Sequence, residues 1–411
     1  MLQTTKLSHR INALFLIIVA FLAAALSGYG QLTNILSAGL LVLILPICII
    51  GIPEKISKAF WALIVFLVFF IVTSIPNYSS LYYLLGTCIM YTLITFAPFF
   101  IKIHVERKYD IGLKKKLFFF GTIIWFCIAL ISIKTYAGSA GGGRDFASDH
   151  RGLVLGGGYN AAYGSAILAV VCFYYLIAGK KGISKKVKAL LFVGLILSAI
   201  HVFLTMSVIT VVAMVLGCLI SIFFRGKKTK RIHFGAIIFS IVLVSVTIFF
   251  LIHTESIGMW MMQTSLKIDN ELISERFAEV GRFLYADNES YHIESRLYTL
   301  QVSWQTFLSH PVIGIGYKYG NTYDLLYQNG VGVHSELLDA LAKYGIIGSI
   351  PYLYFFYHQI RSLVDKSLYR ITIPVVVAFL IMFTFNPFLS VQTIFMLCLY
   401  LPILVELVEK Q

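Results

Sequence analysis

The chain has 411 residues, of which 59% are hydrophobic, and its mean hydropathy is +0.85. Soluble domains contain about 45–50% apolar residues, so this composition excludes a soluble globular protein and indicates a membrane protein. The formal net charge of +14 does not favour a nucleic-acid-binding protein, because most of the basic residues gather in alternate loops between apolar segments.

Twelve apolar segments of about 15 to 21 residues follow one another along the chain. A hydrocarbon core about 30 Å thick takes roughly 20 helical residues to cross, which these segments supply once their flanking residues are included. We therefore predict an all-α polytopic membrane protein with about twelve transmembrane helices and one large helical extracytoplasmic loop. The predicted spans are residues 11–27, 32–51, 60–74, 81–101, 117–136, 159–178, 189–205, 206–224, 234–252, 344–359, 371–385 and 391–408.

The seventh and eighth segments are almost continuous over residues 189–224. These 36 residues exceed any single crossing, so the chain is predicted to turn near Thr205. The first segment follows Lys6 and Arg10 and lacks a small-residue cleavage site, so we expect a retained span and not a signal peptide.

The basic residues determine the expected orientation, because cytoplasmic loops of membrane proteins are enriched in Lys and Arg. With the N-terminus inside, 24 of the 33 basic residues lie in cytoplasmic segments and nine lie outside. Both termini are therefore expected in the cytoplasm. Residues 1–252 would form helices one to nine, residues 253–343 a large outer loop, and residues 344–411 the last three helices.

Two outer segments, residues 138–158 and 253–343, are long enough to carry a functional site. In the second, residues 294–308 have helical spacing and end before Pro311. Arg296 lies in the first turn of this predicted helix, where a cation beside free backbone N–H groups suits a phosphate. The alternative is that Arg296 pairs with Glu294 or Glu289.

His334 precedes a second predicted helix, which continues into the tenth span. Gly345 and Gly348 would permit close packing where this span begins. Imidazole titrates near neutral pH and can act as a general base, and the start of a helix at the membrane surface would hold it where lipid-linked substrates present their head groups. The alternative is that His334 is a structural hydrogen-bonding residue.

Two blocks of sequence resemble the C-terminal signature of the bacterial O-antigen polymerase and O-antigen ligase superfamily. They read SRLYTLQVSWQTFLSHPVIGIGY and HSELLDALAKYGIIG. These proteins are GT-C-like, multi-pass glycosyltransferases that act on undecaprenyl-diphosphate-linked glycans at the outer face of the bacterial inner membrane. The resemblance implies a role in lipopolysaccharide or other polysaccharide biosynthesis, with the active site carried by the large outer loop.

The resemblance also implies roles for single residues. Arg296 would hold the donor diphosphate and His334 would activate the acceptor hydroxyl, with Glu336 as a candidate supporting residue. A third block, RGLVLGGGYNAAYGSA, resembles the family's Arg, Gly and Asn block, which places Arg151 and Asn160 at the corresponding positions. The alternative for Arg151 is a solvated arginine at the membrane interface.

One position departs from the family pattern. Members carry Ser or Thr followed by Arg near the start of the eighth span, whereas Ser207 is followed here by Val208. Either another outer arginine substitutes, or this branch differs, or the chain is an inactive variant. The candidate substitutes are Arg144, Arg276 and Arg282.

The resemblance implies an inverting reaction in which the donor is already activated by its diphosphate. The nearby acidic residues Asp269, Glu271, Asp287 and Glu289 are interpreted as solvated loop, so no metal or cofactor is expected. We favour a polymerase, with a chain-length regulator as a candidate partner. The alternatives are a ligase that uses lipid A-core as acceptor and, from another class, a transporter, which would place charges at the membrane midplane.

Overall fold

The computed structural model describes residues 58–77, 111–137, 159–178, 183–205, 207–224, 252–269, 271–285, 291–316, 330–366 and 371–409, with a few single positions between 95 and 102 and between 238 and 249. Every element within these ranges is helical, which confirms the all-α prediction. Among the described residues, three helices are long and apolar enough to cross a membrane, at Lys58–Asn77, Lys185–Leu204 and Gln392–Glu409. Shorter apolar helices accompany them at Gly121–Lys134, Ala161–Ile177, Val208–Phe223 and Thr372–Phe385.

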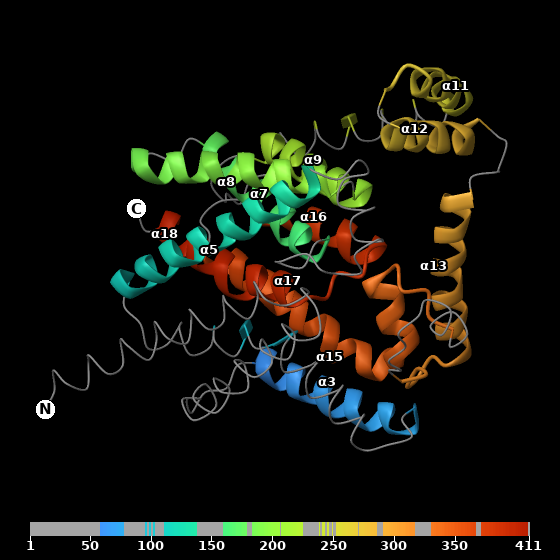
Figure 1. Cartoon of the computed structure of the whole chain (residues 1–411). Coiled ribbons are helices and arrows are strands. Elements are labelled where there is room, and N and C mark those ends of the chain that lie inside the picture. The colour runs from blue at the N-terminus through green and yellow to red at the C-terminus, as the bar shows by residue number, and fades with distance from the viewer. Residues whose placement is uncertain are drawn as a thin grey trace, which may run out of the picture.

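The helices coincide with eight of the twelve predicted spans (Figure 1). The other four, 11–27, 32–51, 81–101 and 234–252, lie outside the described residues apart from single positions. The complete count of twelve therefore stays a prediction. The helices are α3 (Lys58–Ser74) followed by η1 (Ile75–Asn77), α5 (Ile111–Ala137), α7 (Tyr159–Ile177), α8 (Lys185–Leu204), α9 (Val208–Phe223), α11 (Thr254–Ser265), α12 (Glu271–Leu284), α13 (Tyr291–Ser309), α15 (Glu336–Lys366), α16 (Thr372–Phe385), α17 (Val391–Phe395), the π-helical η2 (Met396–Tyr400) and α18 (Leu401–Glu409).

The predicted turn between the seventh and eighth spans is confirmed. Helix α8 ends at Leu204, Thr205 is its C-cap, and α9 begins at Val208 after the N-cap residue Ser207. The Ser207 hydroxyl lies 2.7 Å from Thr210 Oγ1 within the first turn of α9. The two helices are therefore separate, as their combined length required.

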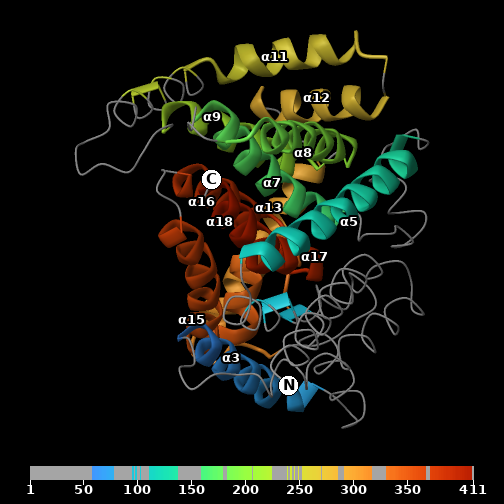
Figure 2. The same cartoon turned by 90° about the vertical axis from the view of Figure 1, so that its left-hand side faces the viewer.

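Helix α7 lies at the centre of the bundle, in contact with α8, α9 and α16 (Figures 1 and 2). Its small residues permit this, because a Cβ added at Gly164 would lie 3.0 Å from the Trp125 ring. From α9, a Cβ added at Gly217 would lie 2.6 Å from Val170. Small residues at helix contacts allow the close backbone approach on which packing within a bilayer depends.

The outer helices turn apolar side chains away from this core. On α8, Phe192, Ile196, Ile200 and Phe203 follow helical spacing and are all exposed, whereas Leu191 and Val202 are buried. An exposed apolar stripe of this kind suits contact with lipid, not water. This surface, with the membrane-length helices, indicates an integral membrane protein.

Helices α11, α12 and α13 belong to the predicted outer loop. Helices α11 and α12 pack side by side in both views. They approach closely at two glycines, since a Cβ added at Gly258 would lie 2.7 Å from the Gly281 carbonyl oxygen. Helix α13 stands across one end of the bundle and contacts α15 (Figure 1).

Helix α15 is sharply kinked at Gly345, whose φ of 57° and ψ of −165° are not helical. A kink of this kind leaves backbone groups of the helix without their usual partners. The segment 311–316 provides partners for four of these groups. The Ile346 N–H donates to Pro311 O, and the Ile347 N–H donates to Val312 O. In return, Ala342 O and Lys343 O accept from the N–H groups of residues 315 and 316.

The kink requires glycine for two reasons. The backbone conformation of Gly345 belongs to a region that essentially only glycine adopts, and an added Cβ would lie 2.4 Å from Val312 O. The prediction of close packing at Gly345 and Gly348 is confirmed, since a Cβ at Gly348 would lie 2.3 Å from the Phe69 ring.

We expect Gly345→Ala to destabilise the protein by about 2–3 kcal/mol or more, because strain and a steric clash act together. The measurement is the midpoint of thermal unfolding in detergent. The matched control is Ile346→Ala, because Ile346 is exposed beside the same kink. An equal effect of the two substitutions would contradict this account of the kink.

Candidate active site

His334 lies in the turn that leads into α15 and is partly buried. The residue before it, Val333, has a φ of 57°. A positive φ is unusual for any residue other than glycine and is a strained conformation for a β-branched one. Strain of this kind persists only where neighbouring contacts hold it, and such contacts surround this turn.

Ser303 of α13 is the first of these contacts and is fully buried. Its hydroxyl donates to Asp339 Oδ1 over 2.6 Å and accepts a hydrogen bond from Gly332 N–H over 2.8 Å. Gly332 lies directly on α13, since an added Cβ would be 2.0 Å from Thr299 O. One hydroxyl therefore ties the residues before His334 to the helix that follows it.

Ser335 and Asp339 close the other side of the turn. The Ser335 hydroxyl accepts from Leu338 N–H over 3.1 Å, and Asp339 Oδ2 accepts from Ser335 N–H over 3.4 Å. These contacts satisfy N–H groups that a helix start leaves without partners. His334 thus stands immediately before a capped helix, as the sequence predicted.

Glu336 is the first residue of α15 and joins three parts of the chain. Its carboxylate accepts from the Tyr352 hydroxyl, beyond the kink, and from Leu389 N–H over 2.9 Å, between α16 and α17. Its own N–H donates to Asn386 O over 3.0 Å. The connection between α16 and α17 is thereby fixed next to the turn that carries His334.

Burial raises the pKa of both carboxyl groups at this site, Glu336 and Asp339. The charge of Lys343 acts in the opposite direction on each, as do the hydrogen bonds from Tyr352 and Ser303 respectively. His334 also favours ionisation of Asp339, which shows that the imidazole and this carboxyl interact electrostatically.

For most of the other predicted site residues, the structure describes either the backbone alone or nothing. Arg296 lies on α13, seven residues before Ser303, with its side chain outside the described part of the structure. The same holds for Asn160 on α7 and Arg276 on α12, while Arg144 and Arg151 lie outside the described residues altogether. Helix α13, which carries Arg296, packs against α15. Among the predicted site residues whose side chains the structure describes, His334 and Glu336 lie at the start of α15, two positions apart in the sequence.

Two further predicted positions are described and exposed. Arg282 is exposed near the end of α12. Val208, which stands where the family carries arginine, is the first residue of α9, and its side chain is 53% exposed. Neither is joined to His334 by a described contact.

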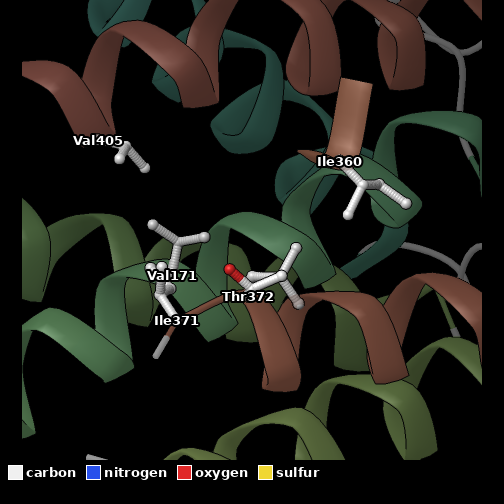
Figure 3. Close-up of a pocket in the computed structure, with 6 residues that line it drawn as sticks. Val171, Ile360, Ile371, Thr372 and Val405 are labelled. Atoms are coloured by element: carbon white, nitrogen blue, oxygen red, sulfur yellow. The ribbon is translucent and has the colours of Figure 1, made fainter. Parts of the chain in front are cut away.

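The pocket in Figure 3 lies elsewhere in the bundle. Ile360 in the last turns of α15 and Ile371 before α16 line it, whereas His334 lies at the opposite end of α15. Its lining is apolar apart from the Thr372 hydroxyl, so it offers none of the acid–base groups found around His334. The remaining lining residues are Val171, Val375 and Val405.

Sequence reasoning missed Ser303, Asp339, Tyr352 and Asn386. Asp339 was within reach, because it lies four residues after Ser335 on one face of the predicted helix. Ser303 lies within the first motif block, but a buried serine has no sequence signal that separates it from a solvated one. Tyr352 and Asn386 reach the site only through tertiary packing.

We expect Ser303→Ala to destabilise the protein by about 1–3 kcal/mol, because it leaves a buried carboxyl oxygen and the Gly332 N–H without their partner. It should also lower activity by loosening the turn around His334. The control is Ser309→Ala, at the exposed end of the same helix, where the hydroxyl bonds only to Gln305 O. The measurement is the midpoint of thermal unfolding of both variants. If Ser309→Ala lowered the midpoint as much as Ser303→Ala, the stabilising role of the Ser303 hydroxyl would be contradicted.

The raised carboxyl pKa values predict how stability depends on pH. Below the usual carboxyl pKa of about 4, Glu336 and Asp339 make their full contribution to the free energy of unfolding. This contribution is lost as pH rises through the higher pKa of the folded state, because the folded chain must then release protons from buried carboxyl groups. Glu336→Gln should reduce this loss, since an amide stays neutral and the Tyr352 hydroxyl can accept as well as donate.

The measurement is the unfolding midpoint between about pH 4.5 and pH 8, with Glu255→Gln, an exposed glutamate of α11, as the control. The control should keep the pH dependence of the unmodified chain. An identical dependence in Glu336→Gln would show that Glu336 does not cause it.

A search of curated proteins found no match to the sequence. The family model for O-antigen ligase, Wzy_C, matches residues 193–353, a region that runs from α8 to just past the kink of α15. The match includes Ser303, His334, Glu336 and Asp339. Residues 193–353 are therefore similar to the O-antigen ligase family, in agreement with the resemblance of the motif blocks.

Proposed function

We propose that the protein is a glycosyltransferase of the bacterial inner membrane that polymerises undecaprenyl-diphosphate-linked oligosaccharide repeat units at the outer face of the membrane. The observation that supports this most directly is the rigid setting of His334, held by α13, α15 and the α16–α17 connection within the family-matched residues. A histidine with only a structural role would not require a strained residue beside it.

The proposed reaction exchanges one carbon–oxygen bond for another. His334 takes the proton of an acceptor hydroxyl as that oxygen attacks the anomeric carbon of the donor sugar. The bond from this carbon to the diphosphate breaks, and its electron pair leaves on the diphosphate. Attack opposite the leaving group inverts the anomeric centre.

The leaving diphosphate requires positive charge, which Arg296 and Arg151 would supply, with Arg144, Arg276 and Arg282 as candidate supporting residues. Arginine suits this role because it donates two parallel hydrogen bonds to phosphate oxygens. The other contribution is positioning, since two membrane-held substrates brought into line need less chemical assistance. No metal or cofactor is assigned a role in this scheme.

The acceptor distinguishes a polymerase from a ligase. In the polymerase it is another lipid-linked repeat unit, and a chain-length regulator is a candidate partner; in the ligase it is lipid A-core. The residues of the GIGY and HSELLDALAKYG segments resemble those of polymerases, so we favour the polymerase. Both termini would lie in the cytoplasm, with residues 253–343 outside.

We expect His334→Ala to lower the rate of polymer formation by about 100-fold or more, because general base catalysis contributes about 10²–10⁴-fold. The measurement is polymer on a gel, after complementation of a strain that lacks the protein, at matched membrane levels. His310→Ala is the control, because His310 is an exposed histidine after α13 and should retain activity. If His334→Ala kept most of the activity, the catalytic role would be refuted.

A further inference from the structure

The side chain of Asn386 is buried, with 7% of the residue exposed, and its Nδ2 atom has no hydrogen-bond partner among the residues that the structure describes. Buried polar groups in folded proteins nearly always have partners, because an unsatisfied donor destabilises the folded state. Each exception therefore needs an explanation. One explanation is a ligand that supplies the missing acceptor.

Asn386 lies at the candidate active site. Its carbonyl oxygen accepts the N–H of Glu336, two residues after His334. Three residues further along, Leu389 N–H donates to the Glu336 carboxylate. The Asn386 peptide therefore packs directly against the start of α15, although residue 386 lies outside the region matched by the family model.

The fold does not require asparagine at this position. As the C-cap residue of α16, it has extended backbone angles of −142° and 154°, which any residue can adopt. Its backbone contacts, from its N–H to Met382 O and from its carbonyl oxygen to Glu336, do not depend on the side chain. Asn77 provides the contrast, since its Nδ2 donates to Ile315 O over 3.0 Å and so joins η1 to the segment that supports the kink.

The chemistry around Asn386 indicates which ligand would suit it. The carboxamide is a neutral donor. The residue bonded to the Asn386 backbone, Glu336, has a carboxyl group whose pKa is raised by burial. A phosphate is bound best by cationic or charge-assisted donors. A sugar hydroxyl, which both donates and accepts, suits a neutral amide beside a carboxyl group.

We propose that Asn386 binds substrate directly, by donating a hydrogen bond to a hydroxyl oxygen of the acceptor sugar next to His334. This inference rests on the proposed function, because there the acceptor hydroxyl is the group that His334 deprotonates. The α16–α17 connection would then form one wall of the acceptor-sugar site, and the arginines would face the diphosphate of the donor.

The test compares Asn386→Ala with Asn77→Ala, both purified as full chains in detergent. Asn386→Ala should leave the unfolding midpoint unchanged or raise it, because it removes an unsatisfied buried donor. Asn77→Ala should lower the midpoint, because its amide contacts the protein. If Asn386→Ala lowered it as much as Asn77→Ala does, Asn386 would be structural and the inference would be overturned.

Binding is then measured from the shift of the unfolding midpoint with ligand concentration. The two probes are the repeat-unit oligosaccharide released from its diphosphate and inorganic diphosphate. Asn386→Ala should weaken oligosaccharide binding about threefold to tenfold, the usual effect of one hydrogen bond, and leave diphosphate binding unchanged. Unaltered oligosaccharide binding, weaker diphosphate binding, or no binding of the oligosaccharide to the unmodified chain would each overturn the inference.

His334→Ala separates this inference from the proposed function. It should still bind the oligosaccharide but form polymer about 100-fold more slowly or slower still. If His334→Ala remained active while Asn386→Ala still lost oligosaccharide affinity, the catalytic proposal would fail and the sugar site would stand. If His334→Ala were inactive and Asn386→Ala bound normally, the reverse would hold.

Discussion

The backbone pairing between residues 311–316 and 342–347 is the interaction on which the candidate site depends. At the kink of α15, two N–H groups and two carbonyl groups lose their helical partners, and the Pro311 to Gly316 segment supplies all four replacements. Near a membrane, water is not readily available to bond such groups, so this pairing makes the kink stable. The first turns of α15 can then leave the direction of the span, so that the helix begins beside α13 and not within the bundle.

The pairing also explains why the two motif blocks occur together. One block supplies the segment from Pro311 to Gly316, in which Gly314 and Gly316 have positive φ angles, and the other supplies the kink at Gly345. Without the other block, the backbone N–H and carbonyl groups of each would lack these hydrogen-bond partners. Because α13 leads directly into the Pro311 to Gly316 segment, the helix that carries Ser303 and Arg296 is fixed relative to His334 by the same contacts.

Around this backbone pairing, the site is built from buried polar groups. Each would destabilise the fold if it had no partner, but together they satisfy one another. Ser303, Asp339 and Gly332 satisfy one another, and Glu336 joins Tyr352 to the α16–α17 connection. Networks of this kind impose one geometry, because each member left without a partner is penalised in a poorly solvated setting. Among the described residues of this site, the strain at Val333 and the unsatisfied Nδ2 of Asn386 depart from this rule. Val333 precedes His334 and Asn386 is bonded to Glu336, so a function of the site can account for both.

The bundle itself provides a stable platform for the site. Small residues allow α7 to be enclosed by its neighbours, and the apolar side chains of α8 face outward. The transport alternative would place charges at the middle of such a bundle. Within the described residues, the ion pair between Lys114 and Glu406 joins α5 to α18, at the ends of those helices expected in the cytoplasm, and the polar groups around His334 lie at the opposite end of the bundle.

The sequence by itself determined the helical class, eight of the apolar helices, the turn at Thr205, the ends of α13 to within a few residues, and the placing of His334 before a helix. These features depend on local periodicity, segment length and helix-breaking residues, which are readable along the chain. Tertiary structure decided which polar groups meet. Ser303 and Asp339 are 36 residues apart and Glu336 and Leu389 are 53 apart, and one serine or carboxylate looks like another until the chain folds. The same reason hid Asn386: only the packed structure shows that its carboxamide is buried and that its Nδ2 atom has no partner in the described part of the chain.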